Sequence, residues 1–256
     1  MKIFFDWPLG VSLAVFLIVT VLLSILIYLI SHKIIIKQLK KRHERTGRVL
    51  FRTTASLLAL LLSLTFANQR VNYYKIKDSL ESEATHLVDI TLDLQLFGTT
   101  RAHEIQEKVK HYIRSILHDK VKSEDENPFF TPSVSIFIML YNNISDLEAT
   151  TPKQVQLKQN LLADIDAVSD FMQVRGYRSR PEPLNLIYIA TFGFIVSSIL
   201  FSVYKPDRIS ISFLSLYNGF VAIVLYFIIM MNNPFIGPLR IEYEPFKILI
   251  EIANMN

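Results

Sequence analysis

The sequence predicts an all-α membrane protein in which four transmembrane helices accompany a helical extramembrane domain inserted between the second and third. Three observations lead to this prediction. Four long apolar blocks carry at most one charge each, a strongly basic segment follows the first block, and apolar residues of the central region recur every three or four positions. Hydrophobic residues make up 51% of the 256 residues, more than is usual for a soluble domain.

The first two blocks form a hairpin within residues 1–67. Residues 9–30 carry no charge and can cross a hydrocarbon core of about 30 Å at about 1.5 Å per residue. The block is longer than the apolar core of a signal peptide, and basic residues follow it in place of a cleavage site, so we expect it to be retained. Residues 49–67 form the second span, and Arg52 near its start can extend its charge to the interface.

The last two blocks form a second hairpin within residues 184–233. Residues 184–204 and 209–233 carry no charge, and only Lys205, Pro206, Asp207 and Arg208 separate them. So short a connection requires the two spans to be antiparallel neighbours. Residues 234–256 then form a C-terminal tail.

The orientation follows from the basic residues of the short loops, which stay in the cytoplasm. The connection between the first two spans is the most basic of the chain, and Lys205 and Arg208 of the second hairpin fall on the same side. We therefore expect a bacterial inner membrane protein whose N-terminus, helical domain and C-terminus are extracytoplasmic. For the basic residues of the first connection, a role in orienting the protein in the membrane is favoured over nucleic-acid binding. These residues are Lys33, Lys37, Lys40, Lys41, Arg42, Arg45 and Arg48.

The extramembrane domain, residues 68–183, starts as a continuation of the second span. No proline or glycine lies between the second span and Gly98, so one long helix should run to about Phe97 and end at that glycine. Residues on one face of this helix are apolar or small: Tyr73, Ile76, Leu80, Ala84, Leu87, Thr91 and Leu94.

Three more helices are expected in this domain. Residues 101–117 have an inner face of Ala102, Ile105, Val109, Tyr112, Ile113 and Ile116. An acidic loop, residues 123–127, follows. Thr131-Pro132 and Thr151-Pro152 are typical helix starts, because threonine caps free amides and proline fits the first helical position. The third helix should end near Leu147. The fourth should end near residue 174 and direct inward Val155, Leu162, Ile165, Val168 and Phe171.

Polar clusters of the domain favour solvation over chemistry. His103, Glu107 and His111 follow one another at one-turn spacing, with His118 two turns further, a spacing that could hold a metal ion. All four lie opposite the apolar face centred on Ile105, so a solvated face is the first interpretation and a site between subunits the second. The aspartates 164, 166 and 170 have no evident partner base and are also read as solvated.

The sequence therefore gives little support to an enzyme. There is no cysteine, glycine is scarce, and no nucleophile–His–acid or phosphate-binding motif is present. We assign no catalytic residue, metal or cofactor. A lipid- or cell-wall-directed enzyme would depend on His103, Glu107 and His111 alone.

The spans carry two sets of small or polar residues. Thr53, Ser56, Ser63 and Ala67 follow helical spacing on the second span, and they either pack against a neighbour or line a water-filled path in an oligomer. The other set allows close helix packing and consists of Gly193, Ser197, Ser215, Asn218 and Gly219. Asn218 lies in mid-membrane, where an amide is expected to bond to a neighbouring helix.

Two segments identify a resemblance that covers residues 46–246. The second span with LTFANQRVNYYKIKDSLESEATHLVDI resembles the bacterial bestrophin-like family, long listed only as a domain of unknown function, in which a Glu-Ala pair lies on the long helix, here Glu83 and Ala84. The tail MNNPFIGPLRIEYEPF resembles the Pro-Phe-x-Gly signature of that family, here Pro234, Phe235 and Gly237. From the residues alone, the prolines stop the last helix and Gly237 allows a tight turn.

The resemblance implies an ion channel. Bestrophins are pentameric anion channels with a similar order of spans and helices, so by analogy we expect a homo-oligomer, pentameric if the analogy holds, that contacts lipid and passes inorganic anions along the second span. The large helical region of bestrophins is cytosolic, whereas the basic loop here predicts the opposite side. A second hypothesis is a non-conducting envelope scaffold or sensor whose outer helices bind a protein partner.

Overall fold

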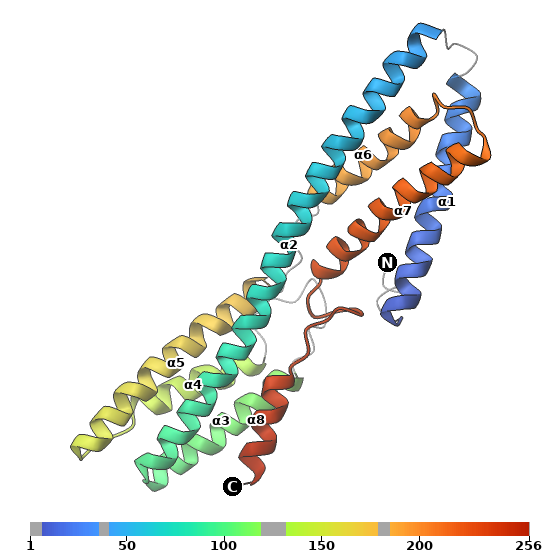
Figure 1. The fold of residues 1–256 in the computed structure, drawn as a ribbon. Coiled ribbons are helices and arrows are strands. Elements are labelled where there is room, and N and C mark those ends of the chain that lie inside the picture. The colour runs from blue at the N-terminus through green and yellow to red at the C-terminus, as the bar shows by residue number, and fades with distance from the viewer. Residues whose placement is uncertain (1–6, 36–40, 119–131, 179–184, 256) are drawn as a thin grey trace. The chain divides into compact units, whose positions relative to one another are not determined.

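The computed structural model describes residues 7–35, 41–118, 132–178 and 185–255, and in these ranges the chain is entirely helical, with no strand (Figure 1). Lys37, Lys40, the acidic loop 123–127, the expected cap Thr131 and the first residue of the third span, Leu184, lie outside the described residues. The helices are α1 (Leu9–Ile35), α2 (Lys41–Phe97), α3 (Thr100–His118), α4 (Pro132–Ser145), α5 (Pro152–Arg178), α6 (Asn185–Phe201), α7 (Arg208–Met231) and α8 (Glu244–Met255).

Within the described residues, three helices are long and apolar enough to cross a membrane, which confirms a membrane protein in coarse outline. The candidate spans are Leu9–Ile34, Glu44–Phe97 and Arg208–Met231. Helix α6 is equally apolar in character but shorter, with its apolar part at Ile187–Phe201. The expected fourth span therefore stays a prediction.

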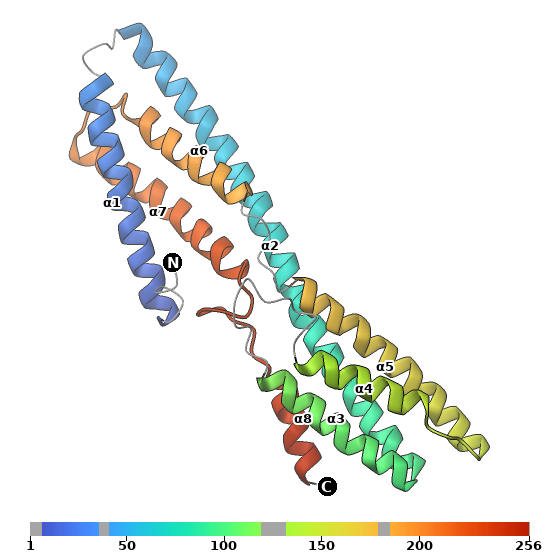
Figure 2. The same cartoon turned by 180° about the vertical axis from the view of Figure 1, so that it is seen from behind.

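The described helices group into two compact units, and α2 contributes to both. Unit 1 comprises residues 1–73 and 181–240. In it, α1, α6, α7 and the first part of α2 lie side by side (Figures 1 and 2). Its main apolar cluster joins α2 to the α6–α7 hairpin and consists of Leu58, Leu62, Ile187, Ala190, Phe194, Val221, Leu225 and Ile228.

Aromatic rings hold the hairpin end of unit 1 together. Phe51 of α2 contacts Phe201 and Tyr204, with ring centroids 5.1 and 6.3 Å apart. Tyr28 of α1 meets Phe201 edge-on at 5.6 Å, and the Arg48 guanidinium lies 5.3 Å from the Tyr204 ring centre. Edge-to-face rings and a cation over a ring are each favourable beyond the area that they bury, so this cluster ties α1, α2 and α6 together.

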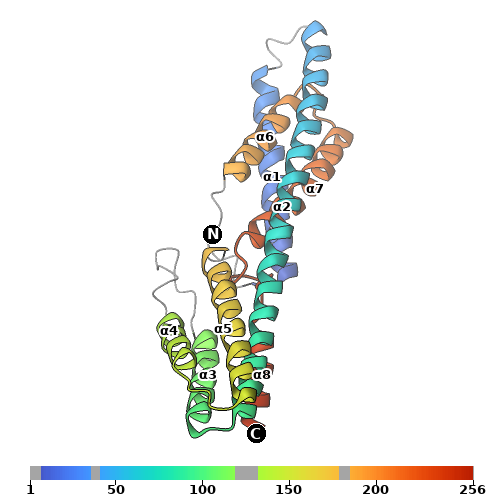
Figure 3. The same ribbon diagram turned by 90° about the vertical axis from the view of Figure 1, so that its left-hand side faces the viewer.

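Unit 2 comprises residues 74–180 and 241–256 and has its own core. The second part of α2, α3, α4 and α5 pack along one another, and α8 contacts α3 (Figure 3). The six residues predicted for the inner face of α3 are all fully buried, which confirms that face. The core also buries Phe137 of α4, Ile165 and Val168 of α5, and Phe246 of α8.

Local chemistry explains the ends of three helices, of which the Gly98 and Thr151 ends were predicted and the Thr99 cap was not. Gly98 ends α2 with a φ of +72°, a left-handed conformation that glycine adopts without strain. Thr99 then caps α3, since its Oγ1 accepts from the Ala102 amide at 3.2 Å. At α5, Thr151 Oγ1 accepts from the Gln154 amide while Gln154 Oε1 accepts from the Thr151 amide, a reciprocal capping box.

Two features differ from the expectations. Val155 was assigned to the inner face of α5 but is 46% exposed, because Leu157 and Leu161 fill that part of the core. The tail also contains a helix that the sequence did not predict, because Glu244–Met255 forms α8, with Phe246 and Leu249 buried.

Candidate functional site

The small polar residues of α2 in unit 1 lie on one exposed stripe. Thr53, Ser56, Ser63 and Ala67 are all exposed in the single chain. At about 100° per residue, the four positions fall within about 80° of one another around the helix axis. The Thr53 hydroxyl donates to the Val49 carbonyl of its own helix at 3.1 Å, so it needs no partner from another helix.

The opposite side of α2 packs against the rest of unit 1. Leu58, Leu62, Thr65 and Gln69 are buried, and they lie roughly half a turn around the helix from the stripe. Leu58 and Leu62 belong to the cluster with α6 and α7. One face of α2 therefore holds the unit together, while the stripe of small polar residues has no partner inside the described chain.

The glycines of the hairpin allow neighbouring helices to approach. A Cβ placed on Gly193 of α6 would lie 3.1 Å from Cδ1 of Leu58, closer than ordinary van der Waals contact. A Cβ on Gly219 of α7 would lie 3.9 Å from Val21, with room to spare. The Ser197 and Ser215 hydroxyls donate to carbonyls one turn back in their own helices, so both hydroxyls are satisfied locally and the small serine side chains allow close packing.

Asn218 of α7 differs from the expectation for a mid-membrane amide. The side chain is fully buried, yet neither its Nδ2 nor its Oδ1 has a hydrogen-bond partner among the described residues. The predicted bond to a neighbouring helix is therefore not formed with any helix residue that the structure describes. An internal water molecule is the ordinary way to satisfy such a group.

A polar row on α1 holds the first span to the hairpin and was missed in the sequence. The Ser12 hydroxyl bonds to Tyr226 Oη at 2.5 Å. Tyr28 Oη donates to the Tyr204 carbonyl at 3.2 Å. His32 Nδ1 lies 2.7 Å from the carbonyl oxygen of Ser202. The signal was available, because residues 12, 24, 28 and 32 differ by multiples of four in an otherwise apolar helix.

The Glu-Ala pair lies in the core of unit 2. Glu83 is fully buried, Ala84 is 5% exposed, and Glu83 Oε1 accepts a 3.0 Å hydrogen bond from the hydroxyl of the buried Tyr112 on α3. A carboxyl group without water needs such a donor. Periodicity identified Tyr112 as a core residue but not as the partner of Glu83.

The Pro-Phe-x-Gly segment forms the expected turn after α7. Pro234 is buried, Phe235 is half-buried, and Gly237 has a φ of +94°, which favours glycine. The Gly237 carbonyl accepts from the Arg240 amide, and Tyr73 Oη donates to the Leu239 carbonyl at 3.0 Å. The turn is thus fixed to α2 within unit 1.

The histidine row of α3 is exposed. His103, Glu107 and His111 are all on the surface, and Glu107 accepts from Lys110 Nζ at 2.9 Å; the side chain of His118 lies outside the described residues. Asp170 is exposed as well.

Two of the three aspartates of α5 have partners that the sequence did not reveal. Asp166 accepts from Tyr141 Oη at 3.0 Å, and Asp164 pairs with His86 of α2. Both pairs join residues that are distant in the sequence, which explains why spacing along α5 alone did not predict them.

The comparison with protein families decides what these two units are. The family model of the bestrophin-like domain matches residues 18–246. The chain belongs to the bestrophin-like family. No curated protein matches the sequence. The bestrophin-like match spans α2 with its stripe, the Glu83-Ala84 pair and the Pro-Phe-x-Gly turn, which are the segments that carried the resemblance.

Proposed function

We propose that this bestrophin-like protein is an oligomeric ion channel that passes inorganic anions, with its pore lined by α2. The observation that carries the proposal is the stripe of Thr53, Ser56, Ser63 and Ala67, which is exposed on the side of α2 away from the helices that pack on it. A hydroxyl group that faces lipid finds no hydrogen-bond partner there. A hydroxyl group that faces a water-filled pore on a symmetry axis can contact hydrated ions.

One chain alone offers too few helices for an aqueous path. Copies of α2 arranged around an axis would place their stripes toward one another, and cyclic symmetry generates such a ring from a single surface. By analogy with bestrophins, we infer a pentamer. The described part of the stripe carries no acidic residue, which suits anions better than cations.

We also infer that α6 is a fourth span. Its 17 residues cover about 25 Å at about 1.5 Å per residue, slightly less than a typical core, and a local adjustment of the bilayer accommodates so small a mismatch. With four spans in the inner membrane, the basic connection between α1 and α2 is cytoplasmic and unit 2 extracytoplasmic.

Reconstitution tests conduction. Purified oligomer in planar bilayers should give unitary currents whose reversal potential follows the anion gradient. Silent bilayers from a well-folded, homogeneous oligomer would contradict the proposal.

Cysteine substitution tests the pore-lining face, and the chain is suited to it because it contains no cysteine. Ser56→Cys and Ser63→Cys should react with a charged, water-soluble thiol reagent and lose current. The matched control is Leu57→Cys: Leu57 is 62% exposed on the same helix but points about 100° away from Ser56 and about 120° away from Ser63, so it should face lipid and stay unreactive. Equal reaction at all three positions would show that the stripe lines no pore.

The alternative is a non-conducting scaffold or sensor whose unit 2 binds a protein. The surface of α3, with His103, Glu104 and Glu107 exposed, is one part of unit 2 available to such a partner. Crosslinking in cells from Glu104 would capture another protein under this alternative, and only copies of the same chain under the channel proposal.

A further inference from the structure

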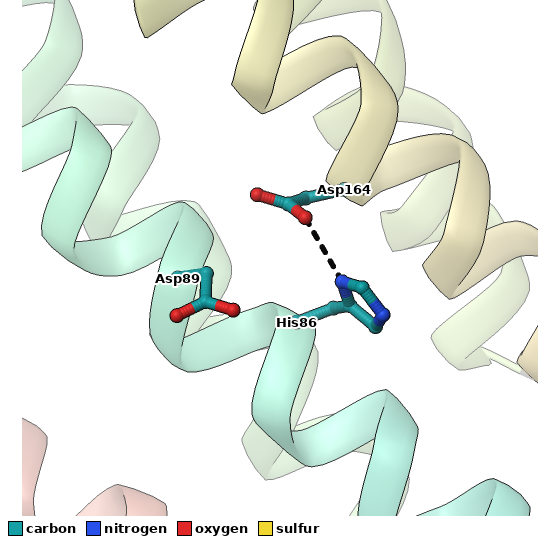
Figure 4. A group of neighbouring side chains, drawn as sticks. All are labelled: His86, Asp89 and Asp164. Carbon is teal, nitrogen blue, oxygen red and sulfur yellow. Dashed lines mark hydrogen bonds and ion pairs between the residues drawn. The ribbon is translucent and has the colours of Figure 1, made fainter.

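A second polar cluster lies in unit 2, between α2 and α5. His86 and Asp89 extend from α2, and Asp164 of α5 points across at His86 (Figure 4). Nδ1 of His86 is 2.9 Å from Oδ1 of Asp164. One ligand atom of each of the three residues lies within 4.8 Å of the other two.

The simplest explanation of the cluster is a hydrogen-bonded His–Asp pair beside a solvated acid. The His86 ring stacks on Phe171 of α5 with centroids 5.6 Å apart and an interplanar angle of 27°. This stacking fixes the plane of the imidazole so that Nδ1 faces Asp164. The pair alone, however, does not explain why further acids gather there.

Negative charge accumulates at this point without a basic partner. Among the described residues, Asp89, Asp93 and Asp164 form no ion pair with lysine or arginine, and His86 is the one group that pairs with any of them. Burial and, after it, the charges of Asp164 and Asp89 raise the pKa of Asp93, although the Asn160 side chain donates to it. Three carboxyl groups therefore share a small region in which a cation would be stabilised.

The distances suit a small ion. Metal–ligand bonds of about 2.0–2.2 Å place adjacent ligand atoms about 2.8–3.6 Å apart in octahedral or tetrahedral geometry. The 2.9 Å between His86 Nδ1 and Asp164 Oδ1 is close to that separation. The Asp89 carboxylate, about one helical turn from His86, already offers an oxygen within 4.8 Å of the other two ligand atoms.

We propose that His86, Asp89 and Asp164 bind one divalent first-row transition metal ion, with Zn²⁺ as its representative. An imidazole nitrogen favours such ions over Mg²⁺ and Ca²⁺, which prefer oxygen ligands alone. His86 is about a third exposed and Asp164 less, so the ion would keep water on its open side and would tie α2 to α5 inside unit 2. The site is independent of the proposed conduction.

Metal titration of the full-length protein in detergent tests the proposal. After removal of metal with a chelator, Zn²⁺ should bind with one ion per chain and raise the thermal unfolding midpoint by mass action. Mg²⁺ and Ca²⁺ should bind at least about tenfold more weakly. Equal affinity for all three ions would overturn the proposal in favour of a nonspecific acidic surface.

Two variants assign the ligands. Asp89→Asn changes an exposed side chain and should leave the fold intact, while weakening Zn²⁺ binding at least about tenfold. His86→Gln should weaken it further. The matched control replaces His103 and His111 by Gln on the exposed row of α3 and should bind Zn²⁺ as the wild type does. Unchanged binding in Asp89→Asn and His86→Gln, or lost binding in the control, would overturn the assignment.

Discussion

The Tyr112 hydroxyl donates a 3.0 Å hydrogen bond to Oε1 of Glu83, and both side chains are fully buried in unit 2. The bond joins α2, which carries the Glu-Ala pair of the bestrophin-like signature, to α3. A buried carboxyl group that loses its donor bears the cost of its own desolvation.

Tyr112→Phe should therefore destabilise unit 2. Removing the hydroxyl leaves Glu83 Oε1 without this donor in a site closed to water, and we expect a loss of about 1–3 kcal/mol in the free energy of unfolding. Thermal unfolding of the purified protein measures it. The control is Tyr141→Phe, which removes the 3.0 Å bond to the exposed Asp166 and should have a much smaller effect. Equal losses of unfolding free energy in the two variants would mean that the burial of Glu83 does not increase the cost of removing its hydrogen-bond donor.

The contact between Gly193 and Leu58 predicts an effect of side-chain size on the packing of α6 against α2. A Cβ at Gly193 would lie 3.1 Å from Leu58 Cδ1, so Gly193→Val should force α6 away from α2 and cost about 1–3 kcal/mol of stability. Shortening the neighbour in the double variant Gly193→Val with Leu58→Ala should recover part of that loss. Gly219→Ala is the control, because its Cβ would meet Val21 at 3.9 Å. If the stability loss of the double variant equals the sum of the losses of the two single variants, the contact between Gly193 and Leu58 is contradicted.

Local sequence signals predicted the helices of unit 2 well because each signal acts within one turn. Gly98 ended α2, Thr151 started α5, and three-four periodicity selected the buried face of α3. The error at Val155 has the same origin: periodicity gives a face, but neighbouring helices decide how far along the helix that face is covered. Helix α8 was not predicted, although Pro245 lies in its first turn, where proline is well placed.

The polar partners could not be predicted because they depend on tertiary contacts. Ser12 meets Tyr226 across 214 positions, and His86 meets Asp164 across 78. Nothing in the spacing along one helix indicates which residue of another helix lies opposite. The sequence thus identified polar residues on helix faces, while the pairs themselves required the packing of α1 on α7 and of α2 on α5.

Asp207 predicts a pH dependence at the start of α7. Its side chain accepts from the Ser210 amide at 2.6 Å, and this bond holds the pKa of the carboxyl below its ordinary value. A lowered folded-state pKa means that the unfolded chain binds more protons, so the stabilisation is present above about pH 4 and is lost as the pH falls through the lowered pKa. At pH 7 the thermal unfolding midpoint of Asp207→Ala should lie below that of the wild type. The difference between the two midpoints should become smaller below about pH 4. Asp207→Asn keeps a capping oxygen without a charge, so it should show no such narrowing.

The side of the membrane occupied by unit 2 is open to a direct test, because the basic connection and the analogy with bestrophins predict opposite answers. If the basic connection governs insertion, a cysteine in place of the exposed Glu104 on α3 should react with a membrane-impermeant maleimide added to intact spheroplasts. A cysteine in place of Lys205, in the exposed turn between α6 and α7, should react only after the cells are opened. The two positions control for each other, since both are exposed and neither lies in a span. The reverse pattern would place unit 2 in the cytoplasm, as in bestrophins, and would mean that the lysines and arginines between α1 and α2 do not set the orientation.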